Sequence, residues 1–216
     1  MSKKKDKFRA RKLSDENLYS WYNFNIDKDG RTLYFGPWND ADTGLAVDNV
    51  SPWEVNDYSA QNIIKGLHVL ESESQDPITI DFFSYGGDWD AGMAIRDYML
   101  TCCSHITMRC FGRVRSMGTI ILQAADTRLI SPDCLFMIHY GKTGCDMDHS
   151  MDFQAYAEHT KGINLRMEEI YLERIREKKA RFSAAKLREM MMFDLYLQPK
   201  DAVELGLADG LIEQTR

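Results

Sequence analysis

The sequence lacks the long apolar runs of a membrane protein and the cysteine patterns of a metal or disulfide protein. No stretch of the 216 residues approaches the roughly 18 consecutive apolar residues of a membrane-spanning helix, and no apolar signal-peptide core follows the start. The five cysteines are an odd number, and no Cys-x-x-Cys pair occurs. We therefore expect a cytoplasmic protein with reduced thiols that binds no membrane, no metal ion and no other cofactor.

Features of nucleotide-binding and nucleic-acid-binding proteins are also missing. The phosphate-binding motif Gly-x-x-x-x-Gly-Lys-Ser/Thr does not occur, so any use of ATP must belong to a partner. The formal net charge of −6 argues against a general nucleic-acid-binding protein. A hydrophobic content of 44% and a charged content of 28% are ordinary for a soluble globular chain, and the length suffices for one domain with a core.

The start of the chain differs in composition from the rest. Residues 1–12, MSKKKDKFRARK, are basic and nearly devoid of apolar side chains. We predict a flexible basic arm over residues 1–25 and a single domain over residues 26–216. The arm is either a solvated tail or a contact for a phosphate backbone or an acidic partner surface.

The most informative stretch is residues 111–139, FGRVRSMGTIILQAADTRLISPDCLFMIH. The apolar run at residues 106–111 and the apolar segment at residues 119–125 predict a strand, a tight turn and a helix, with Ser116 at the helix start. A second apolar run, at residues 135–138, ends in His139. A serine at a helix start lies near free backbone N–H groups that can hold an oxyanion, and a histidine at a strand end can reach it.

Two simpler interpretations stay open at this point. Ser116 can serve only as an N-cap, and His139 can be a hydrogen-bonded core residue. The Gly-x-Ser-x-Gly motif of many serine hydrolases is absent, because position 114 is Val.

The remaining pattern predicts an α/β chain with a largely parallel sheet. Alternating or continuous apolar runs predict strands at residues 31–35 and 78–83, and residues 36–55 are expected to form a long loop. Helical spacing predicts a helix capped by Asn56 or Asp57, and a second over residues 91–100.

The C-terminal half is predicted to hold one long helix over residues 152–178 with two apolar stripes. Tyr156, Ile163, Met167 and Ile170 form one stripe, and Leu165, Leu172 and Ile175 form the other. A helix with two apolar faces must pack on both sides, which favours self-association of the chain over a helix folded back on its own core.

Two shorter helices are expected after the long one. Ser183 is the predicted N-cap of a helix over residues 184–192, and Pro199 suits the first turn of the last helix. Asp194 stands between apolar residues, where an acid needs a partner such as a histidine N–H. Asp201 fits better as an acidic residue near a helix N-terminus.

Four motifs in this order resemble those of the Clp protease proteolytic subunit. They are FSYGGDWDAGMAIRDYM, VRSMG, PDCLFMIH and FDLYLQPKDAVELGLADGLI, and the resemblance covers residues 31–212, most strongly after Pro77. It implies a crotonase-like (ClpP-type) α/β spiral of strand–helix units with a protruding strand–helix handle at about residues 140–179.

The resemblance also implies roles for individual residues. Ser116, His139 and Asp194 would form a catalytic triad, and the N–H groups of Gly87 and Met117 would form the oxyanion hole. Backbone on either side would bind an extended substrate by strand addition, and the residues concerned are Gly86, Asp88, Trp89, Tyr140, Gly141, Lys142 and Thr143.

By the same resemblance the chain is a serine endopeptidase that hydrolyses unfolded polypeptides inside a barrel of stacked seven-membered rings, a homo-oligomeric tetradecamer. An AAA+ unfoldase would feed it. The sequence departs from the family pattern at Tyr85, where Pro is usual, at Arg115, where a small residue is usual, and at Phe193, where Arg is common. Two alternatives remain: a dedicated processing protease, for viral or scaffold maturation, that needs no unfoldase, and a non-catalytic ring subunit.

Overall fold

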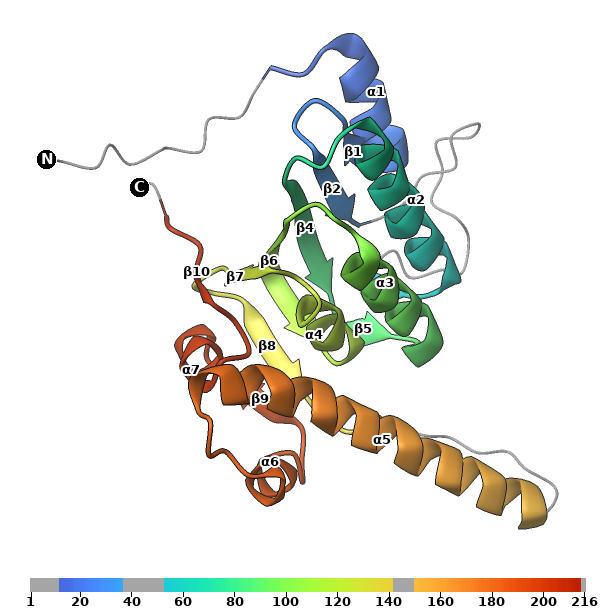
Figure 1. The fold of residues 1–216 in the computed structure, drawn as a ribbon, viewed down its shortest axis with the longest axis vertical. Helices are drawn as coiled ribbons and strands as arrows, with labels where there is room; N and C mark the ends of the chain where they lie inside the picture. Colours follow the sequence, from blue (N-terminus) through green and yellow to red (C-terminus); the bar gives the residue numbers. More distant parts are fainter. Residues whose placement is uncertain (1–11, 37–52, 142–149, 215–216) are drawn as a thin grey trace, which may run out of the picture.

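A mixed sheet of eight strands organises the part of the chain described by the computed structural model, which is residues 12–36, 53–141 and 150–214. Figure 1 shows the element order. The strands are β1 (Ile26–Asp27), β2 (Thr32–Phe35), β3 (Glu54–Val55), β4 (Ile78–Ser84), β5 (Gly86–Gly87), β6 (Ile106–Arg115), β7 (Thr127–Ile130), β8 (Leu135–Ile138), β9 (Leu195–Leu197) and β10 (Gly210–Leu211). The helices are α1 (Asp15–Phe24), α2 (Asp57–Glu73), α3 (Trp89–Thr101), α4 (Met117–Leu122), α5 (Ser150–Lys178), α6 (Ala184–Met190) and α7 (Pro199–Leu205).

The central strand β6 pairs with two different strands, one after the other, along one of its edges. It pairs in parallel with β4 on one side, while on the other its first half pairs with β7 and its end pairs with β8. Gly112 lies where β6 passes from β7 to β8 and has φ +62. A Cβ there would come within 2.4 Å of the Phe83 ring, so glycine allows the bend. This division of β6 directs its last residues toward β8.

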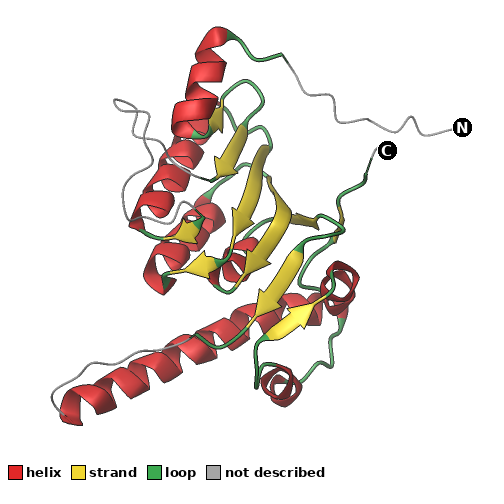
Figure 2. Cartoon of the chain, turned by 180° about the vertical axis from the view of Figure 1, so that it is seen from behind, coloured by secondary structure: helices red, strands yellow, loops and turns green. Residues whose placement is uncertain are grey.

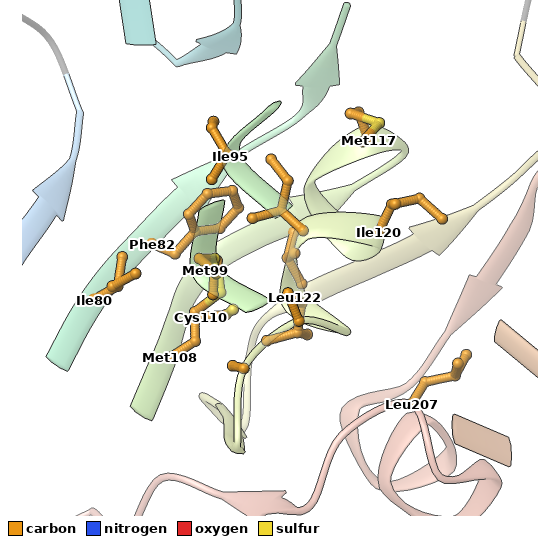
Figure 3. Packing of buried hydrophobic residues seen from close by; sticks show 14 of the residues in the cluster. Ile80, Phe82, Ile95, Met99, Met108, Cys110, Met117, Ile120, Leu122 and Leu207 are labelled. Atoms are coloured by element: carbon orange, nitrogen blue, oxygen red, sulfur yellow. The ribbon is translucent and has the colours of Figure 1, made fainter. Parts of the chain in front are cut away.

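Helices α2, α3 and α4 cover one face of the sheet and build the core. Viewed from behind, the strands lie in front of these helices (Figure 2). On β4 every second residue is buried, the pattern of a strand with one face on the core. Side chains from β4, β6, α3 and α4 meet in one apolar cluster (Figure 3), whose labelled members include Ile80, Phe82, Ile95, Met99, Met108 and Ile120. The expected α/β chain with a largely parallel sheet is confirmed.

The long helix α5 begins at Ser150, two residues before its predicted start, and projects from the body at its N-terminal end (Figure 1). Its C-terminal half packs on the chain's own core. Members of both predicted apolar stripes are buried there, namely Met167, Ile170, Leu172 and Ile175. The two stripes are therefore buried in the chain's own core only over their C-terminal members, and Leu165 of the second stripe remains 44% exposed.

Three further segments show how the predictions compare with the structure. Of the predicted basic arm, residues 1–11 lie outside the described ranges, and its second half forms α1, which the sequence analysis did not assign. Residues 37–52 of the predicted long loop are also outside those ranges, and its end forms β3, which pairs with β5. The predicted caps are confirmed: Asn56 forms a reciprocal capping box with Ser59, and Ser183 caps α6. No helix in the described ranges combines the length and apolar character needed to cross a membrane.

A buried arginine ties the C-terminal segment to the sheet. Arg128 on β7 is 3% exposed and donates hydrogen bonds to Gln123 Oε1 at 2.7 Å and to the Gly206 carbonyl at 3.1 Å. Its Nη2 lies 2.5 Å from Asp209 Oδ1. Burial alone would raise the pKa of Asp209, but the hydrogen bonds from Arg128 outweigh it and hold that pKa below its usual value. Asp209 is therefore the nearer of two carboxylates at this guanidinium, since Glu177 Oε2 lies 3.9 Å from the same nitrogen.

Replacing Asp209 with Ala should destabilise the fold by about 2 kcal/mol, less than the roughly 3–5 kcal/mol of a fully buried pair because the carboxylate is partly exposed. The loss arises because a buried guanidinium keeps only neutral hydrogen-bond partners and the more distant Glu177 carboxylate, 3.9 Å away. Urea unfolding at pH 7 measures it, with the exposed Asp201→Ala as the matched control. Equal midpoints for the two variants would contradict the assignment.

Because the folded-state pKa of Asp209 is lowered, its contribution to the free energy of unfolding should be present above the unfolded-state pKa. That contribution should disappear as the pH falls through the folded-state pKa.

Candidate active site

Ser116 occupies a strained turn between β6 and α4. Its φ of 50° and ψ of −127° lie in a region that residues with a side chain rarely adopt. Its backbone N–H donates to the Met137 carbonyl at 2.9 Å, which extends the β6–β8 pairing by one residue. Within the described residues the side chain makes no capping hydrogen bond. The interpretation of Ser116 as a simple N-cap is therefore wrong, and the hydroxyl is directed elsewhere.

Close approach of β5 explains the glycine beside this turn. Gly86 has φ +98, and a Cβ built there would lie 2.6 Å from Ser116 Cβ and 2.8 Å from the Arg115 carbonyl oxygen. No side chain fits in that space. Gly86 is thus needed for the segment after β4 to lie against the serine turn.

Strand register places the histidine and the aspartate next to the serine. β8 pairs with β6 so that Met137 lies opposite Arg115, and both strands deliver the following residues to the same end of the sheet. β9 pairs antiparallel with β8, with Leu195 opposite Ile138. The residue before Leu195 therefore comes alongside the residue after Ile138, and these two residues are Asp194 and His139.

The three side chains form a continuous chain of contacts. His139 Nε2 lies 2.8 Å from Ser116 Oγ, and His139 Nδ1 lies 3.2 Å from Asp194 Oδ1. A carboxylate can only accept, so the Nδ1 proton is the one donated to Asp194, and Nε2 accepts from the serine hydroxyl. The His139 side chain is 13% exposed and that of Asp194 is 40% exposed. Asp201, the other acid considered, lies on the exposed first turn of α7.

A pocket of about 480 Å³ opens beside the serine. Gly87, Asp88 and Trp89 line one side of it, and Met117 and Gly141 also contribute to its wall. The predicted oxyanion residues Gly87 and Met117 therefore share one space with Ser116.

Two of the predicted substrate-binding residues lie at the start of α3. Trp89 is the first residue of α3, and Asp88 is its N-cap, whose N–H already donates to the Val55 carbonyl at 2.8 Å. Both line the pocket, and the backbone of Asp88 is extended. Lys142 and Thr143 lie outside the described residues.

The opposite wall of the pocket comes from α5 and was not predicted. It consists of Tyr156, His159, Thr160, Ile163, Asn164 and Met167. Three of these, Tyr156, Ile163 and Met167, belong to the first apolar stripe recognised in the sequence. The apolar spacing therefore did identify a functional face of the helix. Within one chain this face forms a wall of the pocket and a contact with the core.

Three of the cysteines in the described residues, Cys102, Cys110 and Cys134, do not compete with this arrangement. Burial raises the pKa of the Cys134 thiol to about 12 and that of Cys102 to about 11, so these thiols stay protonated. Burial likewise raises the pKa of Cys110. No group of three His, Cys, Asp or Glu side chains among the described residues could hold a metal ion.

Comparison with known proteins agrees with this geometry. A family model described as Clp protease matches residues 50–215. The ATP-dependent Clp protease proteolytic subunit of Deinococcus radiodurans is 29% identical over 165 residues, which cover 75% of this chain and 78% of that protein. A mutant of ClpP1 from Listeria monocytogenes has a similar fold, with a TM-score of 0.70 and 24% identity over 87% of this chain and 94% of that one.

The family match spans β3 to the C-terminal strand β10 and so contains every element that contributes to the serine, its neighbours and the pocket. The predicted ClpP-type fold is confirmed by the structural similarity. This chain belongs to the Clp protease family, a family of serine peptidases.

Proposed function

We propose that the chain is the proteolytic subunit of a Clp-type protease, a serine endopeptidase that hydrolyses peptide bonds in unfolded polypeptides in the cytoplasm. One observation carries this proposal. The hydroxyl of Ser116, on a strained turn, lies 2.8 Å from a histidine nitrogen whose other nitrogen contacts a carboxylate. A purely structural serine needs neither a strained backbone nor a histidine–carboxylate pair at its hydroxyl.

The proposed mechanism follows from the hydrogen-bond directions. His139 Nε2 takes the proton from Ser116 as Oγ attacks the peptide carbonyl, and it later gives that proton to the leaving amine. Asp194 accepts from Nδ1, which fixes the tautomer and stabilises the imidazolium. A water molecule then attacks the acyl group on Ser116, activated by the same imidazole.

The oxyanion would be held by backbone donors on both sides of the pocket. Met117 is the first residue of α4, so its N–H has no intrahelical partner. Asp88 donates to β3, and successive N–H groups of a strand point to opposite edges, so the N–H of Gly87 points away from β3. Two such donors can stabilise the charge that develops on the carbonyl oxygen.

Substrate and assembly are proposed on the same basis. The backbone of Gly86–Gly87 on one side and of Tyr140 and Gly141 on the other would flank an extended polypeptide, with one side chain in the pocket. α5 carries exposed apolar side chains, including Phe153 at 58% on its projecting half and Leu165 at 44% near its middle. These fit contacts between copies in stacked rings. An AAA+ unfoldase would supply ATP-driven unfolding, since the sequence has no phosphate-binding loop.

The nucleophile can be tested by covalent labelling. A fluorophosphonate should modify the wild-type chain at Ser116 alone, with loss of fluoride, as read by mass spectrometry of peptides. Ser116→Ala should abolish both labelling and peptide hydrolysis, because the attacking oxygen is gone. Its circular dichroism should match wild type, since the hydroxyl caps no helix. Undiminished turnover by Ser116→Ala would refute the proposal.

The orienting acid can be tested by an isosteric change. Asp194→Asn should reduce kcat on the order of 10⁴-fold, because the amide favours the wrong imidazole tautomer. Asp201→Asn, on an exposed turn, is the matched control and should retain full activity. If Asp201→Asn were inactive and Asp194→Asn active, the carboxylate would be misassigned.

The assembly can be tested on the projecting half of α5. Sedimentation should show wild type as a large oligomer, and the double variant Phe153→Glu with Leu165→Glu should sediment as smaller species, because charge replaces exposed apolar contacts. Gln154→Glu adds a charge to the same exposed surface and serves as the control. An unchanged sedimentation profile in the double variant would show that these side chains do not join copies. Both side chains are exposed, so the fold should be unaffected.

A further inference from the structure

Two buried side chains on α5 face the active site from one side of the helix. Glu168 is 6% exposed and Tyr171 is fully buried, and their spacing of three residues places them on the same face. α5 packs against α4, the helix that follows Ser116. Neither residue lines the pocket, so the proposed mechanism does not use either one. Both side chains form hydrogen bonds to segments that adjoin the residues of the candidate site.

Glu168 connects the histidine segment to the aspartate segment. The Tyr140 hydroxyl donates to Glu168 Oε1 at 2.6 Å, and Tyr140 directly follows His139. The Arg188 guanidinium donates to Glu168 Oε2 at 2.8 Å, and Arg188 lies on α6, which leads into Asp194. One carboxylate therefore holds the chain on both sides of the histidine–aspartate contact.

The protonation states fit these roles. Burial, together with the hydrogen bond to Glu168, raises the pKa of Tyr140 to about 12, so its hydroxyl keeps the proton that it donates. Burial would raise the pKa of Glu168, but the hydrogen bonds from Arg188 and Tyr140 outweigh it and lower that pKa. Glu168 is thus ionised and accepts both bonds at neutral pH.

Tyr171 reaches the serine through one intermediate. The Thr119 hydroxyl donates to the Ser116 carbonyl at 2.6 Å, and its oxygen lies 2.6 Å from the Tyr171 hydroxyl. Because the single proton of Thr119 goes to the carbonyl, Tyr171 is the donor to Thr119. The Thr119 N–H also donates to that carbonyl, at 2.9 Å. This chain of donors holds the strained peptide of Ser116 against α5.

We propose that Glu168 and Tyr171 are positioning residues, through which α5 sets the distance between Ser116 on one side and His139 with Asp194 on the other. This inference rests on the proposed function. Without either contact the triad residues remain present, but the turn or the histidine segment gains freedom. Displacement by about 1 Å can cost up to about 100-fold in rate. The Tyr171 contact acts only on the serine turn, so its loss should change kcat and leave KM unchanged, whereas the Glu168 contact also holds the proposed substrate-binding backbone at Tyr140.

The experiment compares single and double variants of the full chain. Tyr140→Phe and Tyr171→Phe should each lower kcat and the rate of fluorophosphonate labelling by about tenfold, and KM should be unchanged in Tyr171→Phe. Combined, they should lower both by about 100-fold, since they act through separate contacts. Glu168→Ala should lower kcat as much as Tyr140→Phe does. Combining these two changes should lower kcat little further, because both remove the same hydrogen bond. Glu168→Gln keeps an acceptor for Tyr140 and should restore most of the activity.

Controls separate positioning from general stability. Arg188 is 52% exposed, so removing Glu168 leaves no buried charge, and the variants should fold. Tyr98→Phe is the control. It removes a tyrosine hydroxyl that lies outside the pocket and 3.2 Å from His68 Nδ1, and it should keep the wild-type kcat. The inference is overturned if the variants lower Tm but label at the wild-type rate, or if their loss of activity follows dissociation seen by sedimentation. An unlabelled wild-type chain would contradict the proposed function itself, and this inference with it.

Discussion

The candidate site depends on the hydrogen-bond register that joins β6, β8 and β9. In this register Arg115 lies opposite Met137, and Ile138 lies opposite Leu195. A slip by one residue in either pair would turn the adjacent side chains to the other face of the sheet. The serine, the histidine and the aspartate come from three separate segments. Their meeting therefore depends on two strand pairings, which the packing of Phe136 and Ile138 into the core holds in place.

The second constraint is the strained peptide at Ser116. A backbone of this kind, of order 1–3 kcal/mol above a relaxed one, persists only when the surroundings determine it fully. Three contacts do so here: the N–H bond to Met137, the two donors from Thr119 to the Ser116 carbonyl, and the close approach of Gly86. The family motif is therefore a set of backbone requirements as well as a set of reactive groups. Gly86 lies within a motif and Thr119 directly follows one, and both support the Ser116 backbone without reactive groups of their own.

Much of the fold and the residues of the candidate site could be predicted from the sequence, because their signals are local. A strand with every second residue apolar and a cap such as Asn56 with Ser59 are visible in a few consecutive residues. The identities of Ser116, His139 and Asp194 came from motifs that match a known family. What failed depended on tertiary structure. The short strand β3 has no pattern of its own and exists because Gly86 and Gly87 lie beside it.

The sequence also did not show how far the apolar stripes of α5 are buried within one chain, since spacing reveals which residues share a face and not what covers it. Strand β9 illustrates a further consequence of tertiary context. It is three residues long, and Phe193 and Tyr196 around its start are 80% and 54% exposed. Little buried apolar surface holds it, so its local opening free energy must lie well below that of the core strands. Because β9 carries the position of Asp194, heating should remove the carboxylate from the histidine before the molecule unfolds. The enzyme would then lose its activity while still folded, and regain it on cooling.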